Sequence, residues 1–172
     1  MIEEKAANIR LLILDVDGVL TDGRIVLDAG GEETKTFHVR DGLGLKLLIE
    51  AGIGVVIISG RRSHVVEERA RNLGIKEIYQ GVEDKKGLFI KLIQEKRMKK
   101  EQVCCVGDDL PDMPLFNRAG LSIAVADAVP EIREAASFVT KSGGGKGAVR
   151  EVCEVILKAQ KKWREIIAPF LG

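Results

Sequence analysis

Two aspartates, Asp15 and Asp17, directly follow the apolar run Leu11–Leu14, which is typical of a buried parallel strand. Ligands of open α/β sheets bind at the carboxyl ends of strands, and side chains two apart on an extended chain point the same way. Two carboxylates this close repel each other unless a cation or a shared proton compensates them. The pair therefore predicts a divalent metal, with one carboxylate free to attack an electrophile. Taken alone, these aspartates and Gly18 would also fit an ordinary turn.

Two more predicted element ends carry polar groups. Ser59 and Gly60 follow the run Val55–Ile58, where a hydroxyl and a free backbone N–H can hold a phosphate oxygen. A serine that caps the next helix is the alternative. Lys85 stands at a predicted helix start, where a cation is poorly matched to the helix dipole. An anionic ligand would repair that mismatch, although a solvated surface lysine fits the same position.

A cluster of three aspartates, Asp108, Asp109 and Asp112, follows the run Val103–Val106. Carboxylates without His or Cys favour oxygen-only coordination, and beside a phosphate-type ligand they favour Mg²⁺. One of them could cap a helix that has Pro111 at an early position. Three aspartates exceed that need, so the cluster adds to the predicted metal site.

The composition bounds the class of protein. The 172 residues suit one α/β domain, residues 1–172, and 45% hydrophobic with 31% charged residues is ordinary for a globular protein. The formal net charge of +1 implies no nucleic-acid partner, and the basic segment Lys158–Arg164 is expected to be a solvated helix face. No stretch is long enough to span a membrane and no secretory signal is visible, so a cytoplasmic protein is expected. Cys104, Cys105 and Cys153 have no zinc spacing and are expected to be buried, reduced thiols.

Apolar runs alternate with amphipathic runs along the chain, which predicts an α/β fold: a Rossmann-like, doubly wound parallel sheet with helices on both faces. The predicted strands are Arg10–Leu14, Gly54–Ile58, Glu77–Tyr79, Val103–Val106, Leu121–Ala124 and Phe138–Val139. The predicted helices are Gly42–Ala51, Ser63–Leu73, Lys86–Lys96, Pro111–Asn117, Pro130–Ala135 and Gly147–Gln160.

One segment, about residues 24–39, breaks this alternation. Arg24–Asp28 and Glu33–Val39 flank Ala29–Gly31, which predicts a β-hairpin inserted after the first strand. The hairpin is too small to be a cap domain. Its apolar residues need a partner, and a second subunit is a reasonable one. A tail of about residues 161–172 follows the last predicted helix.

The order Asp, Ser, Lys, Asp at the four element ends resembles the haloacid dehalogenase superfamily of phosphohydrolases. A narrower resemblance joins Asp15–Gly23, Phe37–Gly44, Gly107–Asp112 and Gly144–Glu151. These segments are similar to the phosphatases of 3-deoxy-D-manno-octulosonate 8-phosphate, which are capless, tetrameric members of that superfamily. The resemblance implies an Mg²⁺-dependent phosphatase in lipopolysaccharide precursor biosynthesis.

By this resemblance, Asp15 is the nucleophile that forms an aspartyl-phosphate, and Asp17 is the general acid and then the base. The resemblance implies that Mg²⁺ is held by the Asp15 carboxylate, the Asp17 backbone carbonyl and Asp108. Ser59 and Lys85 hold the phosphoryl oxygens. The resemblance also implies that Gly60 contacts the phosphate. It implies that Asp109 and Asp112 reach the metal through water or support the residues that bind it.

The resemblance also implies which residues bind the sugar acid. Arginine suits the substrate carboxylate because its fork matches that group. Arg61 and Arg69 are eight apart, which would place them on one helix face. The implied substrate contacts are Asp17, His38, Val39, Arg40, Asp41, Gly42, Lys46, Arg61, Arg69 and Lys85. In relatives the hairpin builds a ring-like tetramer, and we hypothesise that the loop Ser142–Lys146 or the tail reaches a neighbouring site.

Two alternatives remain open at this point. A phosphatase of a nine-carbon sugar acid 9-phosphate, of the sialic acid type, would need nearly the same residues. A non-enzymatic phospho-acceptor domain also places aspartates at strand ends and binds Mg²⁺, but it keeps the phosphoryl group. Asp17, two residues after the nucleophile, argues against the acceptor, because it provides the acid and base that turnover requires.

Overall fold

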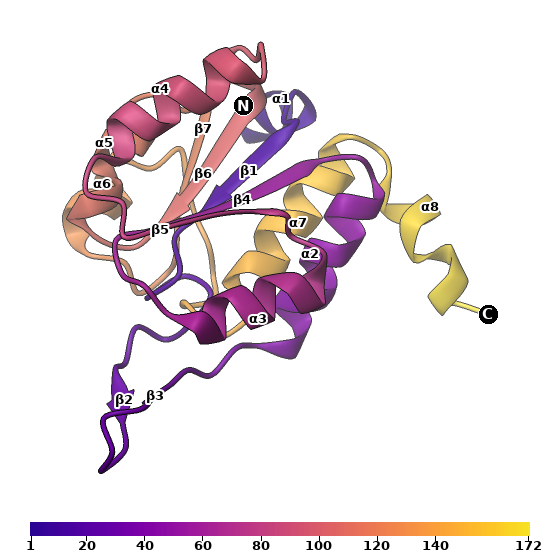
Figure 1. Cartoon of the computed structure of the whole chain (residues 1–172). Coiled ribbons are helices and arrows are strands. Elements are labelled where there is room, and N and C mark those ends of the chain that lie inside the picture. The colour runs from indigo at the N-terminus through magenta and orange to yellow at the C-terminus, as the bar shows by residue number, and fades with distance from the viewer.

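The computed structural model describes residues 1–172, and a six-stranded parallel sheet lies at its centre (Figure 1). In spatial order the strands are β5 (Glu77–Gln80), β4 (Gly54–Ser59), β1 (Leu11–Leu14), β6 (Val103–Gly107), β7 (Leu121–Ala124) and β8 (Phe138–Val139). All six predicted strands are confirmed to within a residue at either end. The inner strands β1, β6 and β7 are buried along their whole length, which is why they read as continuous apolar runs.

Helices cover both faces of the sheet, so the predicted doubly wound α/β fold is confirmed (Figure 1). One layer holds α2 (Val39–Glu50), α3 (His64–Leu73) and α7 (Ala148–Ala159), and the other holds α4 (Lys85–Glu95), α5 (Met113–Phe116) and α6 (Pro130–Ala135). From β1 the chain continues to β4 and β5 on one side, whereas β6, β7 and β8 lie on the other side of β1. The order therefore reverses between β1 and β6, and ligands bind at such a point in doubly wound folds.

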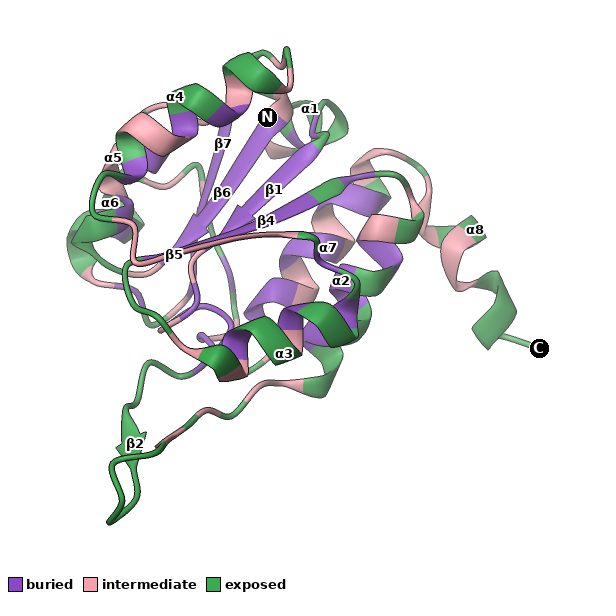
Figure 2. Ribbon diagram, viewed as in Figure 1, coloured by how far each residue is buried: buried purple, intermediate pink, exposed green.

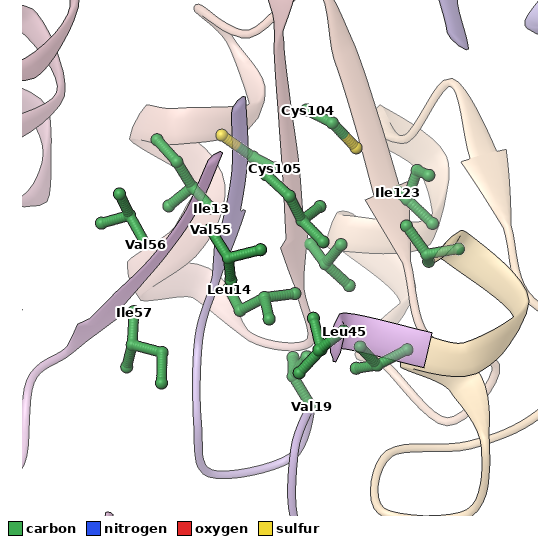
Figure 3. Close-up of a cluster of buried hydrophobic side chains, with 14 of the residues drawn as sticks. Ile13, Leu14, Val19, Leu45, Val55, Val56, Ile57, Cys104, Cys105 and Ile123 are labelled. Atoms are coloured by element: carbon green, nitrogen blue, oxygen red, sulfur yellow. The ribbon is translucent and has the colours of Figure 1, made fainter. Parts of the chain in front are cut away.

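The core is one continuous cluster of buried apolar side chains between the sheet and the two helix layers. Figure 3 shows residues of β1, β4 and β6 in this cluster, with the sulfurs of Cys104 and Cys105 directed away from each other. All three cysteines are buried and unpaired, as expected. Burial raises the pKa of the Cys105 thiol far above its ordinary value, so the thiol stays protonated and packs as a small apolar group.

The inserted hairpin is shorter than predicted. Only β2 (Val26–Leu27) and β3 (Glu33–Thr34) pair, and Val39 is already the first residue of α2. A two-stranded hairpin without a third strand or a packed face is only marginally stable, so its strand pairing stays short. Figure 1 shows the hairpin projecting from the body of the molecule, and Figure 2 shows it almost entirely exposed. Its apolar residues Ile25, Val26 and Leu27 are each more than half exposed.

Other differences from the predicted elements lie at the termini and near the prolines. Helix α1 (Ile2–Ala7) was not predicted, and the predicted helix Pro111–Asn117 divides into a 3₁₀ turn, Leu110–Asp112, followed by α5. The tail contains α8 (Trp163–Ile167), and its last apolar residues, Phe170 and Leu171, are exposed (Figure 2). None of the helices combines the length and the apolar character needed to cross a membrane.

Candidate active site

The predicted strand-end residues converge where the strand order reverses. Asp15 follows β1, Ser59 ends β4, and Asp108 follows β6, and these three line a cavity of about 500 Å³. Of the predicted site residues, the cavity also borders Asp17, Gly60, Arg61, Lys85, Asp109 and Asp112. A larger hollow of about 900 Å³ lies at the amino ends of the strands, but it brings together none of these groups. Chemistry rather than size identifies the candidate site.

Lys85 connects two of the carboxylates. It is the first residue of α4, its side chain is 6% exposed, and its Nζ lies 2.8 Å from Asp15 Oδ1 and 2.7 Å from Asp112 Oδ1. Burial acts to lower the pKa of Lys85, but the charges of Asp15 and Asp112 outweigh it and raise the pKa above its ordinary value. Lys85 therefore remains an ammonium, directed at the strand ends where a phosphate would bind.

The side chains of Asp15, Asp108 and Asp112 form a compact carboxylate cluster. One oxygen from each lies within 4.8 Å of the others. Burial and then the charge of Asp112 raise the pKa of Asp15 to about 6, and burial and then the charge of Asp15 raise the pKa of Asp108 to about 8. Three carboxylates beside the single ammonium of Lys85 sum formally to −2. A divalent cation fits this oxygen-only, partly buried set in both charge and ligand type.

Two glycines make room for this cluster. A Cβ on Gly18, whose φ is +95°, would lie 2.0 Å from Asp108 Oδ2, so both the backbone and the space exclude a side chain. A Cβ on Gly107 would lie 2.5 Å from Asp112 Oδ2. That oxygen accepts a hydrogen bond from the backbone N–H of Asp108 at 3.1 Å. Asp112 is thus buried inside the cluster, held by direct contacts to Lys85 and the Asp108 backbone.

Asp17 is held outside the carboxylate cluster by Lys35 and Glu33, which the sequence did not single out, together with Arg61. Lys35, just after β3, places its Nζ 2.5 Å from Asp17 Oδ1 and 2.7 Å from Glu33 Oε1. Arg61 contacts Glu33 and lies with Nε 3.7 Å from Asp17 Oδ2. The only available signal was period-two spacing, which puts Glu33 and Lys35 on one face of the predicted hairpin.

The predicted helical relation of the two arginines is wrong. Helix α3 begins at His64, and Ser63 before it is extended, with φ −155° and ψ 123°. Arg61 therefore lies in the loop that borders the cavity, and only Arg69 is on the helix. The Arg69 guanidinium lies 5.7 Å from the centre of the Phe37 ring and fills the space beside Gly42.

The other residues predicted to bind the sugar acid lie outside the cavity of the single chain. His38 caps α2, because its Nδ1 accepts a hydrogen bond of 3.2 Å from the backbone N–H of Arg40. Lys46 is on an exposed face of that helix. Asp41 is buried and accepts the backbone N–H of Arg150. The structure does not bring these residues together with Asp15, and their assignment to substrate stays a prediction. Those outside the cavity are His38, Val39, Arg40, Asp41, Gly42, Lys46 and Arg69.

The glycine-rich loop Ser142–Lys146 contacts the candidate site of its own chain. The backbone N–H of Gly145 donates to the Val19 carbonyl at 3.0 Å, and Gly144 lies directly against the Gly18 carbonyl. The loop therefore supports the turn that follows Asp15. These contacts do not test whether the loop also reaches a neighbouring site, which stays a prediction.

Comparisons with known proteins agree with this geometry. Residues 77–152, which include Lys85 and Asp108, match the family model of haloacid dehalogenase-like hydrolases. The chain is 52% identical over 159 residues to the 3-deoxy-D-manno-octulosonate 8-phosphate phosphatase KdsC of Yersinia pestis, covering 92% of this chain and 85% of that protein.

Solved structures give the same result. A probable YrbI family phosphatase from Pseudomonas syringae superimposes with a TM-score of 0.97 at 46% identity, covering 99% of this chain and 97% of that one. The 3-deoxy-D-manno-octulosonate 8-phosphate phosphatase of Moraxella catarrhalis, in complex with magnesium, phosphate and KDO, gives a TM-score of 0.96 at 44% identity, covering 98% and 97%. The chain therefore belongs to the family of 3-deoxy-D-manno-octulosonate 8-phosphate phosphatases, phosphoric monoester hydrolases of the haloacid dehalogenase superfamily.

Proposed function

We propose that this protein is an Mg²⁺-dependent phosphatase that hydrolyses 3-deoxy-D-manno-octulosonate 8-phosphate to the free sugar acid and phosphate, in lipopolysaccharide precursor biosynthesis. The observation that carries the proposal is the contact of Lys85 with Asp15 inside a cluster of three carboxylates, at the strand ends where the sheet order reverses. The family membership supports the substrate, because relatives at about half identity carry that name.

In the proposed reaction, a carboxylate oxygen of Asp15 attacks the phosphorus, and the bond from phosphorus to the sugar oxygen breaks. Asp17 gives a proton to the leaving sugar oxygen, which leaves an aspartyl-phosphate on Asp15. Asp17 then takes a proton from a water molecule as that water attacks the phosphorus, which releases phosphate and restores Asp15. A pKa of about 6 leaves Asp15 mostly ionised at neutral pH, as a nucleophile must be.

The chain's own groups hold the phosphoryl group in this proposal. The Lys85 ammonium, the Ser59 hydroxyl and the Gly60 backbone N–H would stabilise its oxygens as charge develops. Mg²⁺ would be held by the Asp15 carboxylate, the Asp17 backbone carbonyl and Asp108. When bound, it offsets the negative charge that otherwise keeps the phosphate from the carboxylate nucleophile. With all three carboxylates ionised, the cluster and Lys85 carry a formal charge of −2, which supports this assignment.

The sugar acid and the assembly complete the proposal. Arg61 borders the cavity, so it is the arginine placed to meet the sugar acid in a single chain. The remaining predicted contacts would need a neighbouring subunit, and the exposed hairpin of a homo-oligomer, a tetramer by family resemblance, could supply the interface. A cytoplasmic location is part of the proposal, and three buried free thiols are consistent with a reducing compartment.

The test is phosphate release from a panel of phosphorylated sugars, with and without Mg²⁺. The panel contains the octulosonate 8-phosphate and 9-phosphates of nine-carbon acids. Asp15→Asn should abolish turnover without unfolding the protein, and Glu95→Gln, a matched neutralised carboxylate exposed on α4, should leave turnover unchanged.

Each outcome of this panel has a distinct meaning. Strong preference for the octulosonate would support the proposal. Preference for a nine-carbon acid would keep the mechanism and replace the substrate. No release from any sugar, together with a stable phosphoprotein, would favour the phospho-acceptor.

A further inference from the structure

The hairpin inserts a lysine beside the active site that the proposed reaction does not use. The Lys35 side chain is 1% exposed, and its Nζ lies 2.5 Å from Asp17 Oδ1 and 2.7 Å from Glu33 Oε1. A buried ammonium needs carboxylate partners, and this one has two. The contact therefore differs from the solvent-exposed ion pairs of this chain, such as Arg71 with Glu68.

The lysine is part of a closed ring of charges drawn from three segments. Glu33 contacts both Lys35 and Arg61, and both cations face Asp17. Hydrogen bonding to Lys35 is the largest effect that lowers the pKa of Glu33, so Glu33 stays ionised and keeps both partners. The ring joins the loop after β1, the end of the hairpin and the loop after β4.

The two carboxylate oxygens of Asp17 have different contacts within this ring. Oδ1 accepts a hydrogen bond from Lys35, whereas Oδ2 has only Arg61 Nε at 3.7 Å, which is beyond hydrogen-bonding distance. Asp17 borders the cavity, with Oδ1 bound to Lys35 and Oδ2 free of any hydrogen bond within the chain. An aspartate carboxyl without such a tie would rotate between orientations of similar energy.

We infer that Lys35 is a positioning residue that fixes the Asp17 carboxyl for proton transfer to and from the substrate. This inference rests on the proposed function, which makes Asp17 the acid and base. Proton transfer requires the heavy atoms to approach to about 2.6–3.2 Å, and misplacement by about 1 Å can slow a reaction by about 100-fold. Holding Oδ1 keeps Oδ2 at the position where the leaving oxygen, and later the water, must come.

A leaving-group comparison tests this inference. An aryl phosphate loses a good leaving group that needs little protonation, whereas a sugar oxygen must receive a proton as it leaves. We expect Lys35→Met to lower kcat/KM for the octulosonate 8-phosphate by about 10- to 100-fold and to leave kcat/KM for p-nitrophenyl phosphate nearly unchanged. Because kcat/KM reports the steps up to release of the leaving group, the later hydrolysis of the aspartyl-phosphate does not mask the difference.

Matched variants separate positioning from a general loss of structure. Lys35→Arg can still donate to Asp17 and should recover part of the sugar-phosphate activity. Glu33→Gln weakens the hold on Lys35 and should show the same substrate dependence. Its neighbour Glu32 is exposed, so Glu32→Gln should behave as the natural protein, and so should Lys91→Met on the exposed face of α4.

The outcomes decide between the possibilities. Equal loss on both substrates in Lys35→Met, without recovery in Lys35→Arg, would mean that the lysine is only structural and would overturn the inference. Unchanged or faster cleavage of the sugar phosphate would overturn it as well. If Lys35→Met does not fold, Glu33→Gln against Glu32→Gln carries the test. Asp17→Asn, measured alongside, should show the largest dependence on the leaving group. If Asp17→Asn shows no dependence on the leaving group, that result would count against the proposed function, not against Lys35 alone.

Discussion

The backbone N–H of Arg150 donates a hydrogen bond of 2.8 Å to Asp41 Oδ1, across 109 residues of sequence. Helix α7 begins just after Gly147, which has no side chain to cap it. Asp41, in the first turn of α2, supplies the missing acceptor and is 2% exposed. The contact ties the starts of two helices together. It uses one oxygen of the carboxylate that family resemblance assigned to the sugar acid, and the other oxygen, Oδ2, is buried without a hydrogen-bond partner.

Asp41→Ala should therefore destabilise the protein by about 1–3 kcal/mol, because it leaves buried N–H groups at the start of α7 without an acceptor. Asp41→Asn keeps an acceptor and should lose less, since burial already raises the pKa of this carboxyl and disfavours its charge. Chemical denaturation measures both, with Glu32→Ala, at an exposed carboxylate in the hairpin turn, as the control. Unchanged stability combined with a raised KM would instead identify Asp41 as a substrate contact.

Gly144→Ala should damage both stability and activity. A Cβ at this position would lie 1.8 Å from the Gly18 carbonyl oxygen, so the glycine-rich loop and the turn after Asp15 must separate. Such overpacking costs about 1–3 kcal/mol, and the shift reaches Gly18, which packs against Asp108. Gly30→Ala, where the new Cβ would meet only Asp28 Oδ1 at 3.3 Å, is the matched control. Wild-type thermal stability in Gly144→Ala would contradict the observed packing.

Magnesium should stabilise the protein more at high pH than at low pH. The folded-state pKa values of Asp15 and Asp108 are raised from 3.8 to about 6 and about 8. Between pH of about 4 and about 8, the folded protein therefore binds more protons than the unfolded chain. The free energy of unfolding that these two groups contribute falls as the pH rises through this range. Metal binding requires the ionised carboxylates and relieves their repulsion, so protons compete with it below that range.

Thermal unfolding with Mg²⁺ and with a chelator, at about pH 6 and about pH 8.5, measures this linkage. Saturation at about 100 times Kd adds about 2.7 kcal/mol, or roughly 5–10 °C in Tm for a chain of this size. Asp108→Asn should raise the Tm of the metal-free protein at the higher pH and lose most of the response to Mg²⁺. A response that is equal at both pH values would argue against these carboxylates as the ligands.

The fold could be predicted because parallel strands buried on both faces leave a simple trace in the sequence. Leu11–Leu14 and Val103–Gly107 are continuous apolar runs, and the polar residues that end such runs must meet at one edge of the sheet. Asp15, Ser59 and Asp108 could therefore be placed together before any coordinates. Their positions depend on strand ends, which the hydrophobic pattern locates well.

Contacts that depend on the path of loops could not be predicted in this way. Lys35 reaches Asp17 because the hairpin leaves β1 and returns past its end, and no periodicity records that path. The spacing of Arg61 and Arg69 predicted one helix face for both, but α3 begins only at His64, after the extended Ser63. The cap that Asp41 provides for α7 could not be predicted either, because its partner Arg150 lies across the fold.

Arg61→Ala should raise KM for the sugar acid phosphate more than for an aryl phosphate. The guanidinium borders the cavity and is partly exposed, and a bidentate contact to a carboxylate is what arginine forms best. Glu33 forms an ion pair with this guanidinium, so the substrate carboxylate must compete with Glu33 or share the guanidinium with it. We expect KM for the sugar acid to rise by about 10-fold or more, equivalent to about 1.4 kcal/mol, with Arg62→Ala as the neighbouring control. Equal effects on both substrates would show that Arg61 acts only through Glu33 and Asp17, and the carboxylate would then have to be recognised by another residue.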